Sequence, residues 1–146
     1  MTEDATQVVR IERTFDAPAE DVFDAWTSAD VIRRWFRPGR DWGTPSAEVD
    51  LRVGGTVRVV MRSPDGTEVG AGGEYTVIER PRRLTFTWTF DDDPSNQQII
   101  ELEFTERDGA TTVLFVNSNI SHEERRDQQY RGWQACLDNM ERALAA

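Results

Sequence analysis

The stretch Arg83–Phe90 reads RLTFTWTF and alternates strictly between large apolar residues and polar ones. Leu84, Phe86, Trp88 and Phe90 share one side, because successive side chains of a β-strand point to opposite faces. The pattern predicts a half-buried strand with one broad aromatic face. Such a face either fills a solid core or forms one wall of a cavity, and the rest of the chain bears on that choice.

The segments around this stretch also alternate and are separated by short turn signals, such as Gly54-Gly55 and Asp108-Gly109. A loop rich in proline and glycine is expected over residues 37–46. Residues 48–117 therefore have the pattern of an antiparallel meander. Besides 83–90, strands are predicted over residues 7–15, 48–51, 56–62, 73–79, 99–105 and 111–117.

Three helices are expected. One begins at Ala17-Pro18, where proline suits the first helical position, and a second short one begins at Ser28. The third is long: Ser121 and Glu124 fit a capping box, and an apolar stripe of period near 3.6 follows. Its members are Tyr130, Trp133, Leu137, Met140 and Leu144. The order of strand, two short helices, six strands and a long helix predicts the α+β class, with the long helix covering the sheet.

Composition limits the classes of partner and location. The chain has 146 residues, which predicts one domain over residues 1–146, with the polar residues 1–6 expected to be loose. Its 17 basic and 27 acidic residues give a formal net charge of −10, which argues against nucleic acid as a partner. The sequence shows neither an apolar signal core at its start nor a run long enough to span a bilayer, so a cytoplasmic location without membrane insertion is expected.

The residues that most often carry chemistry are sparse. His122 is the single histidine and Cys136 the single cysteine, so neither an internal disulfide nor a histidine-based metal site is expected. On one helix these two residues would lie about 21 Å apart, too far for a nucleophile and its base. We therefore predict no catalytic residue, no metal ligand and no cofactor, and a non-enzymatic function is favoured without excluding an enzyme.

Short motifs occur in a fixed order along residues 8 to 145. They are Ala17-Pro18, Ala25-Trp26-Thr27, Trp35-Phe36, residues 50–55 (DLRVGG), residues 73–75 (GEY), residues 84–88 (LTFTW), Gly132-Trp133 and residues 136–140 (CLDNM). In this order they resemble the START-like (SRPBCC) superfamily, and within it the branch named for the activator of the heat-shock-protein-90 ATPase. The resemblance implies a helix-grip fold, in which a curved antiparallel sheet of about seven strands wraps a long C-terminal helix. Two short helices follow the first strand, and a cavity often lies between sheet and long helix.

The resemblance leaves several functions open, because one fold hosts many activities. Members bind lipids or aromatic polyketides, cyclise polyketides, or protect against small toxic molecules in stress responses. The leading hypothesis is the binding of a small hydrophobic molecule, aromatic or lipid-like, between sheet and long helix. One alternative is a chaperone-interacting regulator, and another is an enzyme resembling polyketide cyclases or hydrolases. Monomer and homodimer both stay open.

The candidate ligand-binding residues combine the aromatic strand, the helical stripe and the second short helix. Large aromatic side chains are typical of small-molecule sites and equally of solid cores. Arg37 stands where many relatives carry a small residue, so it is expected to bring a charge to the cavity mouth and, with Tyr75, to orient the ligand. The predicted set is Trp35, Phe36, Arg37, Tyr75, Phe86, Trp88, Trp133 and Leu137.

Overall fold

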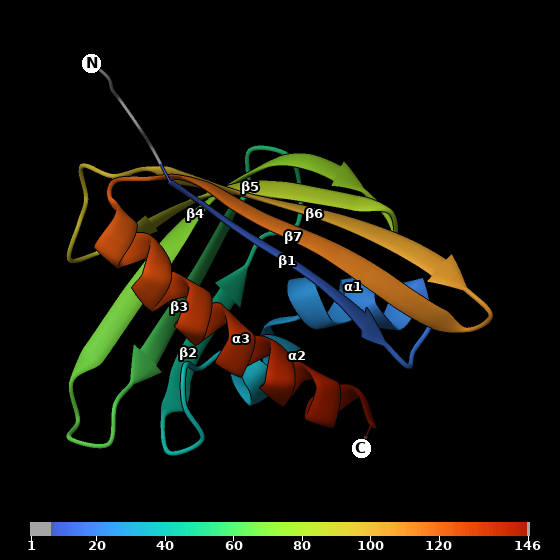
Figure 1. Cartoon of the computed structure of the whole chain (residues 1–146), viewed down its shortest axis with the longest axis horizontal. Helices are drawn as coiled ribbons and strands as arrows, with labels where there is room; N and C mark the ends of the chain where they lie inside the picture. Colours follow the sequence, from blue (N-terminus) through green and yellow to red (C-terminus); the bar gives the residue numbers. More distant parts are fainter. Residues whose placement is uncertain (1–6, 146) are drawn as a thin grey trace.

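The computed structural model describes residues 7–145 of the chain. These residues form a seven-stranded antiparallel sheet and three helices (Figure 1). The predicted α+β class and order of elements are confirmed, whereas the expectation for residues 1–6 lies outside the described residues. The elements are β1 (Gln7–Phe15), α1 (Ala19–Thr27), α2 (Ala29–Trp35), β2 (Gly43–Val49), β3 (Thr56–Arg62), β4 (Glu68–Glu79), β5 (Arg83–Phe90), β6 (Gln98–Arg107), β7 (Ala110–Ile120) and α3 (Glu123–Ala145).

The sheet has the strand order β1-β7-β6-β5-β4-β3-β2, and every neighbouring pair is antiparallel. Strands β2 to β7 form the predicted meander, and β1 returns to pair with β7. Figure 1 shows the sheet curving around α3, which lies across it, with α1 and α2 beside the C-terminal half of α3. The helix-grip arrangement expected from the resemblance is thus present.

The aromatic face of β5 points into the space between sheet and α3. Leu84, Phe86 and Trp88 are at most 4% exposed, while Phe90 at the end of the strand is half-buried. The rings of Trp88 on β5 and Trp133 on α3 have centroids 6.3 Å apart. Burial of these side chains holds the helix on the sheet, since each fully buried large apolar side chain contributes roughly 1.5–3 kcal/mol.

Two strands differ from their predicted bounds. Strand β2 runs over Gly43–Val49 rather than over the predicted 48–51, so it begins inside the expected loop. It tolerates Pro45 because it is an edge strand with an irregular register. Strand β4 begins at Glu68 rather than at Gly73, so Gly70 and Gly72 also belong to the strand. A Cβ on Gly73 would lie 1.8 Å from the Thr87 carbonyl oxygen, so the close approach of β5 requires glycine here.

The first residues of α1 and α3 also differ from the prediction. Pro18 occupies the N-cap of α1 instead of its first turn, and the Glu106 carboxylate on β6 accepts a hydrogen bond of 2.8 Å from the Ala19 N–H. In α3 the cap is His122, whose Nδ1 accepts from the Arg125 N–H at 3.2 Å, and not the predicted Ser121. Tyr130, placed in the apolar stripe by its spacing, is 44% exposed.

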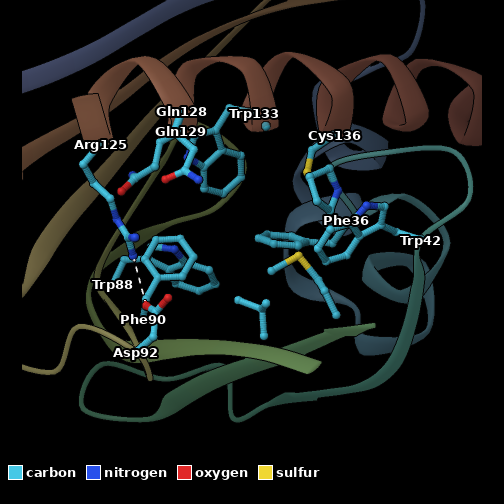
Figure 2. A pocket seen from close by; sticks show the side chains of 14 residues that line it. Phe36, Trp42, Trp88, Phe90, Asp92, Arg125, Gln128, Gln129, Trp133 and Cys136 are labelled. Carbon is cyan, nitrogen blue, oxygen red and sulfur yellow. Dashed lines mark hydrogen bonds and ion pairs between the residues drawn. The ribbon is translucent and has the colours of Figure 1, made fainter. Parts of the chain in front are cut away.

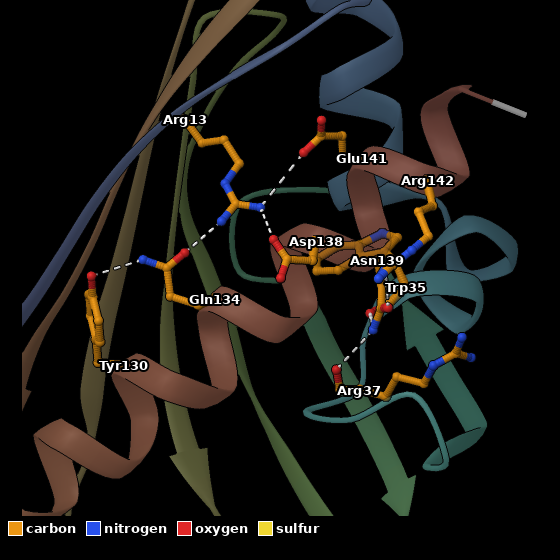
Figure 3. Close-up of polar contacts among 9 residues, drawn as sticks. All are labelled: Arg13, Trp35, Arg37, Tyr130, Gln134, Asp138, Asn139, Glu141 and Arg142. Carbon is orange, nitrogen blue, oxygen red and sulfur yellow. Dashed lines mark hydrogen bonds and ion pairs between the residues drawn. The ribbon is translucent and has the colours of Figure 1, made fainter.

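Polar contacts fasten α3 to the elements beside it (Figure 3). Arg13 of β1 donates hydrogen bonds of 2.6 Å both to Asp138 and to Gln134, and Gln134 in turn donates to the Tyr130 hydroxyl at 2.9 Å. Further along the helix, the Asn139 amide donates to the Arg37 carbonyl oxygen at 3.2 Å. These bonds fix α3 against β1 on one side and against the segment after α2 on the other.

Candidate ligand-binding cavity

A cavity of about 260 Å³ lies between α3 and the half of the sheet formed by β3, β4 and β5 (Figure 2). The segment joining α2 to β2 forms its remaining wall. Among the lining residues, the half-buried and exposed ones mark the side that faces solvent. The lining consists of Phe36, Pro38, Trp42, Met61, Val69, Trp88, Phe90, Asp92, Arg125, Gln128, Gln129, Gly132, Trp133 and Cys136.

One face of α3 supplies almost half of this lining. Arg125, Gln129, Gly132 and Cys136 are separated by three or four residues, which places them in one row along a helix. Figure 2 shows this row spread along the cavity, with Arg125 at one end and Cys136 at the other. The sheet contributes by alternation instead: Met61 of β3 and Val69 of β4 are directly paired and point to the same face.

The middle of the cavity is aromatic. Phe36, Trp88 and Trp133 form a triangle whose ring centroids lie 5.2 to 6.3 Å apart. Phe90 extends this group at 6.1 Å from Trp88. The separations and the tilted or edge-on angles are those that aromatic pairs prefer, so the rings hold one another in place and present a preformed apolar wall.

Three neutral amides form a buried group behind one wall, here called the amide cluster: Gln98, Asn117 and Gln129. The Gln129 amide nitrogen donates to Gln98 Oε1 at 2.9 Å and to Asn117 Oδ1 at 2.8 Å, and Gln98 donates back to Gln129 at 3.0 Å. Trp133 Nε1–H also donates to Asn117 Oδ1, at 3.2 Å. The cluster thereby satisfies its members and orients the Trp133 ring.

A charged pair stands at the end of the cavity near the start of α3, and we call it the charged end: Arg125 and Asp92. Arg125 Nη2 lies 3.1 Å from Asp92 Oδ1, and the guanidinium carbon lies 4.9 Å from the Phe90 ring centroid. The Arg125 side chain is 18% exposed and that of Asp92 is 65% exposed. The cation is therefore held against the apolar wall, whereas its partner carboxylate lies largely in water.

Cys136, at the opposite end of the cavity, has a thiol of low reactivity. Its thiol donates a hydrogen bond to the Arg37 carbonyl oxygen at 3.2 Å, and burial raises the pKa of the thiol to about 12. The thiolate is the nucleophilic form, so at neutral pH this group is a packing residue.

Three of the predicted site residues line this cavity: Phe36, Trp88 and Trp133. Trp35 is next to Phe36 in sequence but is turned toward α1, where its indole N–H donates to the Ala25 carbonyl oxygen at 2.8 Å. Trp35 and Phe86 instead face a separate void of about 10 Å³, which is large enough for roughly one water molecule.

The other three predicted residues lie outside the lining. Leu137 is a 1% exposed core residue. Tyr75 is also 1% exposed and packs edge-on against Phe86, and burial raises the pKa of its phenol above the ordinary range. Arg37 contributes its backbone carbonyl, which accepts from Cys136 and Asn139, rather than a charge at the cavity. The cation at the cavity is Arg125 instead.

Several lining residues escaped prediction. Trp42 lies in an irregular loop, where the sequence does not indicate which way a side chain points. Val69 lies in the first half of β4, which was not predicted as a strand because of its glycines. Arg125 and Gln129 do carry a signal, because they continue the spacing of Trp133 and Cys136 toward the start of α3. That row reads as polar, so a search for apolar stripes passes over it.

Two further observations bound the chemistry. Within residues 7–145, no three His, Cys, Asp or Glu side chains lie together as a set of metal ligands. None of the helices described is both long and apolar enough to cross a membrane.

Comparison with known proteins identifies the family. The family model described as "Activator of Hsp90 ATPase homolog 1-like protein" matches residues 16–145. A search of curated protein sequences gave no match. Among solved structures, an AHSA1-like protein from Aeromonas hydrophila is 33% identical with a TM-score of 0.79, and the match covers 95% of this chain and 92% of that one.

Two other structures show how widely the fold is shared. CalU16 from Micromonospora echinospora is 26% identical with a TM-score of 0.74, and the match covers 96% of this chain and 77% of that one. Protein CV1439 from Chromobacterium violaceum is 21% identical with a TM-score of 0.84, covering 96% and 99%, a likeness of fold alone. The family model and the Aeromonas protein together decide the assignment: the chain belongs to the family of activator of Hsp90 ATPase homolog 1-like proteins.

Proposed function

We propose that this protein binds a small, mainly apolar aromatic molecule in the cavity between α3 and the sheet. The observation that carries the proposal is the cavity itself, with five aromatic side chains in its wall: Phe36, Trp42, Trp88, Phe90 and Trp133. Concave, largely apolar sites with a few placed polar groups are where small molecules bind. Removing the apolar surface of a ligand from water would drive binding, at roughly 25 cal/mol per Å² before ordering costs.

The volume narrows the class of ligand. An apolar cavity of about 150 Å³ suffices for benzene, and drug-sized molecules occupy roughly 300–1,000 Å³. At about 260 Å³ the cavity suits a molecule of one or two rings better than a multi-ring polyketide or a long acyl chain. This favours an aromatic ligand over a lipid-like one.

A thermal-unfolding screen tests the proposal with one- and two-ring aromatic compounds and, for comparison, medium-chain fatty acids. At a hundred times its dissociation constant, a ligand adds about 2.7 kcal/mol, which raises the melting temperature of a chain of this size by roughly 5–10 °C. Stabilisation by aromatic compounds is expected. Melting temperatures that no compound raises would contradict the proposal.

A matched pair of variants locates the site. Val69 and Val60 are both half-buried and lie on paired strands, but Val69 lines the cavity whereas Val60 pairs with Gly70 on the other face of the sheet. Val69→Phe is expected to obstruct the cavity and abolish the ligand-induced shift, while Val60→Phe keeps it. Loss of the shift in both variants, or in neither, would place the ligand elsewhere.

The family description supports a second candidate, the regulation of a chaperone of the Hsp90 type. Stoichiometric recovery of such a chaperone with the purified protein, together with a change in its ATPase rate, would favour this function over ligand storage or transport. The enzyme alternative has less support from the lining. The protonated Cys136 thiol is a poor nucleophile, and the Asp92 carboxylate is paired with Arg125 and largely exposed.

A further inference from the structure

Around the cavity, those buried side-chain polar atoms of residues 7–145 that lack a hydrogen-bond partner are all donors. Among the lining residues of the described chain, two buried side-chain polar atoms have no hydrogen-bond partner, Trp88 Nε1 and Arg125 Nε. Both carry an N–H. The buried acceptors of the wall are occupied, since Gln129 Oε1 receives the Gln98 amide and the amide cluster uses its other oxygens internally.

Leaving a buried donor unpaired costs roughly 1–3 kcal/mol, so a ligand that supplies an acceptor recovers that free energy as affinity. Trp88 is 1% exposed and its indole N–H is closed to atoms the size of water, so the donor group that a ligand can reach is the guanidinium of Arg125, whose side chain is 18% exposed. A purely hydrocarbon ligand would leave the Arg125 donor unmet. The wall therefore selects for a molecule with acceptor atoms.

The guanidinium of Arg125 narrows the acceptor further. The Nε–H and Nη2–H of arginine lie on one edge and together match a carboxylate. On the surface of this protein, Arg62 uses both atoms on Glu68 and Arg126 uses both on Asp127. Arg125 places only Nη2 on Asp92, and its Nε is buried without a partner in the described structure.

Asp92 competes only weakly with a ligand carboxylate for the Nε–Nη2 edge of Arg125. Its side chain is 65% exposed, so it can turn into water at little cost, because exposed ion pairs contribute only about 0.2–1 kcal/mol. Arg125 is 18% exposed and packs on the Phe90 ring, which keeps the cation at the cavity when Asp92 leaves. Figure 2 shows the Arg125 side chain reaching from α3 across this end of the cavity to Asp92, beside Trp88 and Phe90.

From these observations we infer that the ligand is an organic anion, a small aromatic carboxylate whose ring lies on the aromatic wall and whose carboxylate binds Arg125 in place of Asp92. This inference rests on the proposed function and assigns Arg125 as the residue that determines specificity for charge.

Isothermal titration calorimetry with 2-naphthoate and its neutral isostere 2-naphthamide tests the inference. The carboxylate is expected to bind about tenfold more tightly, since hydrogen bonds to charged groups are the stronger ones. Arg125→Gln should reduce the affinity for 2-naphthoate to that for 2-naphthamide. Arg126→Gln is the matched control: it removes the same charge one residue away, outside the lining, and should leave both affinities unchanged.

Asp92→Asn separates recognition of the ligand from a merely structural ion pair. If Asp92 competes with the ligand, this variant binds 2-naphthoate about two- to fivefold more tightly and 2-naphthamide as before. Unchanged or weaker 2-naphthoate binding in Asp92→Asn would overturn the inference, and the melting temperature of each variant reports on its folding.

Two results distinguish the failure of this inference from that of the proposed function. Equal binding of 2-naphthoate and 2-naphthamide, unaffected by Arg125→Gln, would overturn the preference for anions and leave aromatic binding intact. Failure of both probes and of naphthalene to bind the folded protein would overturn both.

Discussion

Replacing Gly132 by alanine is expected to stabilise the protein. Gly132 lies in the interior of α3, where glycine is less favourable than alanine by about 0.8–1 kcal/mol because of its greater freedom in the unfolded chain. A Cβ built on Gly132 meets the Pro38 Cβ at 3.7 Å, which is an ordinary van der Waals contact, and that is the nearest atom outside the backbone of α3. The free energy of unfolding should therefore rise by almost the full difference in helix propensity, about 1 kcal/mol.

Urea denaturation followed by circular dichroism measures this change. The midpoint should rise with an unchanged slope, and the melting temperature should rise by about 3 °C. The reverse substitution in the same helix, Ala135→Gly, is the matched control and should cost about 1 kcal/mol or slightly more, because Ala135 is half-buried. If Gly132→Ala destabilises while Ala135→Gly behaves as expected, the space beside Gly132 is not open and the geometry of this cavity wall is wrong.

Three further predictions concern other sites. Cys136, with its thiol pKa raised to about 12, should not react with a disulfide reagent at pH 8 until urea unfolds the protein. The Ser63 hydroxyl and the Thr67 N–H lower the pKa of Asp65 to about 2. The stabilising contribution of this carboxylate is therefore present above pH 4 and is lost as the pH falls toward 2. The urea midpoint of Asp65→Asn should differ from that of the wild type at pH 7 but not near pH 2. Trp35→Phe removes the indole hydrogen bond to α1 and should cost about 1–3 kcal/mol in urea unfolding, and a neutral outcome would contradict the importance of that bond.

The fold was readable from sequence wherever the side-chain pattern was strict. Strands β3 and β5 have the predicted bounds, because uninterrupted alternation leaves a single assignment of faces. The first part of strand β2 was assigned to a loop because Pro45 is typical of loops, and only the sheet order shows that β2 lies at an edge, where proline is tolerated. The glycines of β4 concealed its first half. A Cβ on Gly72 or Gly73 would collide with the carbonyl oxygen of Val57 or Thr87 on a neighbouring strand, a constraint that the local sequence does not show.

The candidate site was only partly predictable, for a different reason. Trp35 and Phe36 are adjacent aromatics, and composition alone does not tell which one faces the cavity; the hydrogen bond of Trp35 to α1 decides it. Likewise, Arg37 and Arg125 are both arginines near apolar segments. The placement of Arg125 depends on the angle at which α3 crosses the sheet, a tertiary property.

The amide cluster has a mechanical consequence for the space beside it. Apolar contacts are not directional, so by themselves they leave the position of α3 along the sheet loosely defined. The bonds from Gln129 to Gln98 and Asn117 are directional and tie one turn of α3 to β6 and β7. A shift of the helix by one residue would break them inside the protein, where water cannot replace them. The cluster thus fixes the position of α3 on β6 and β7, and with it the position of the helix face that lines the cavity.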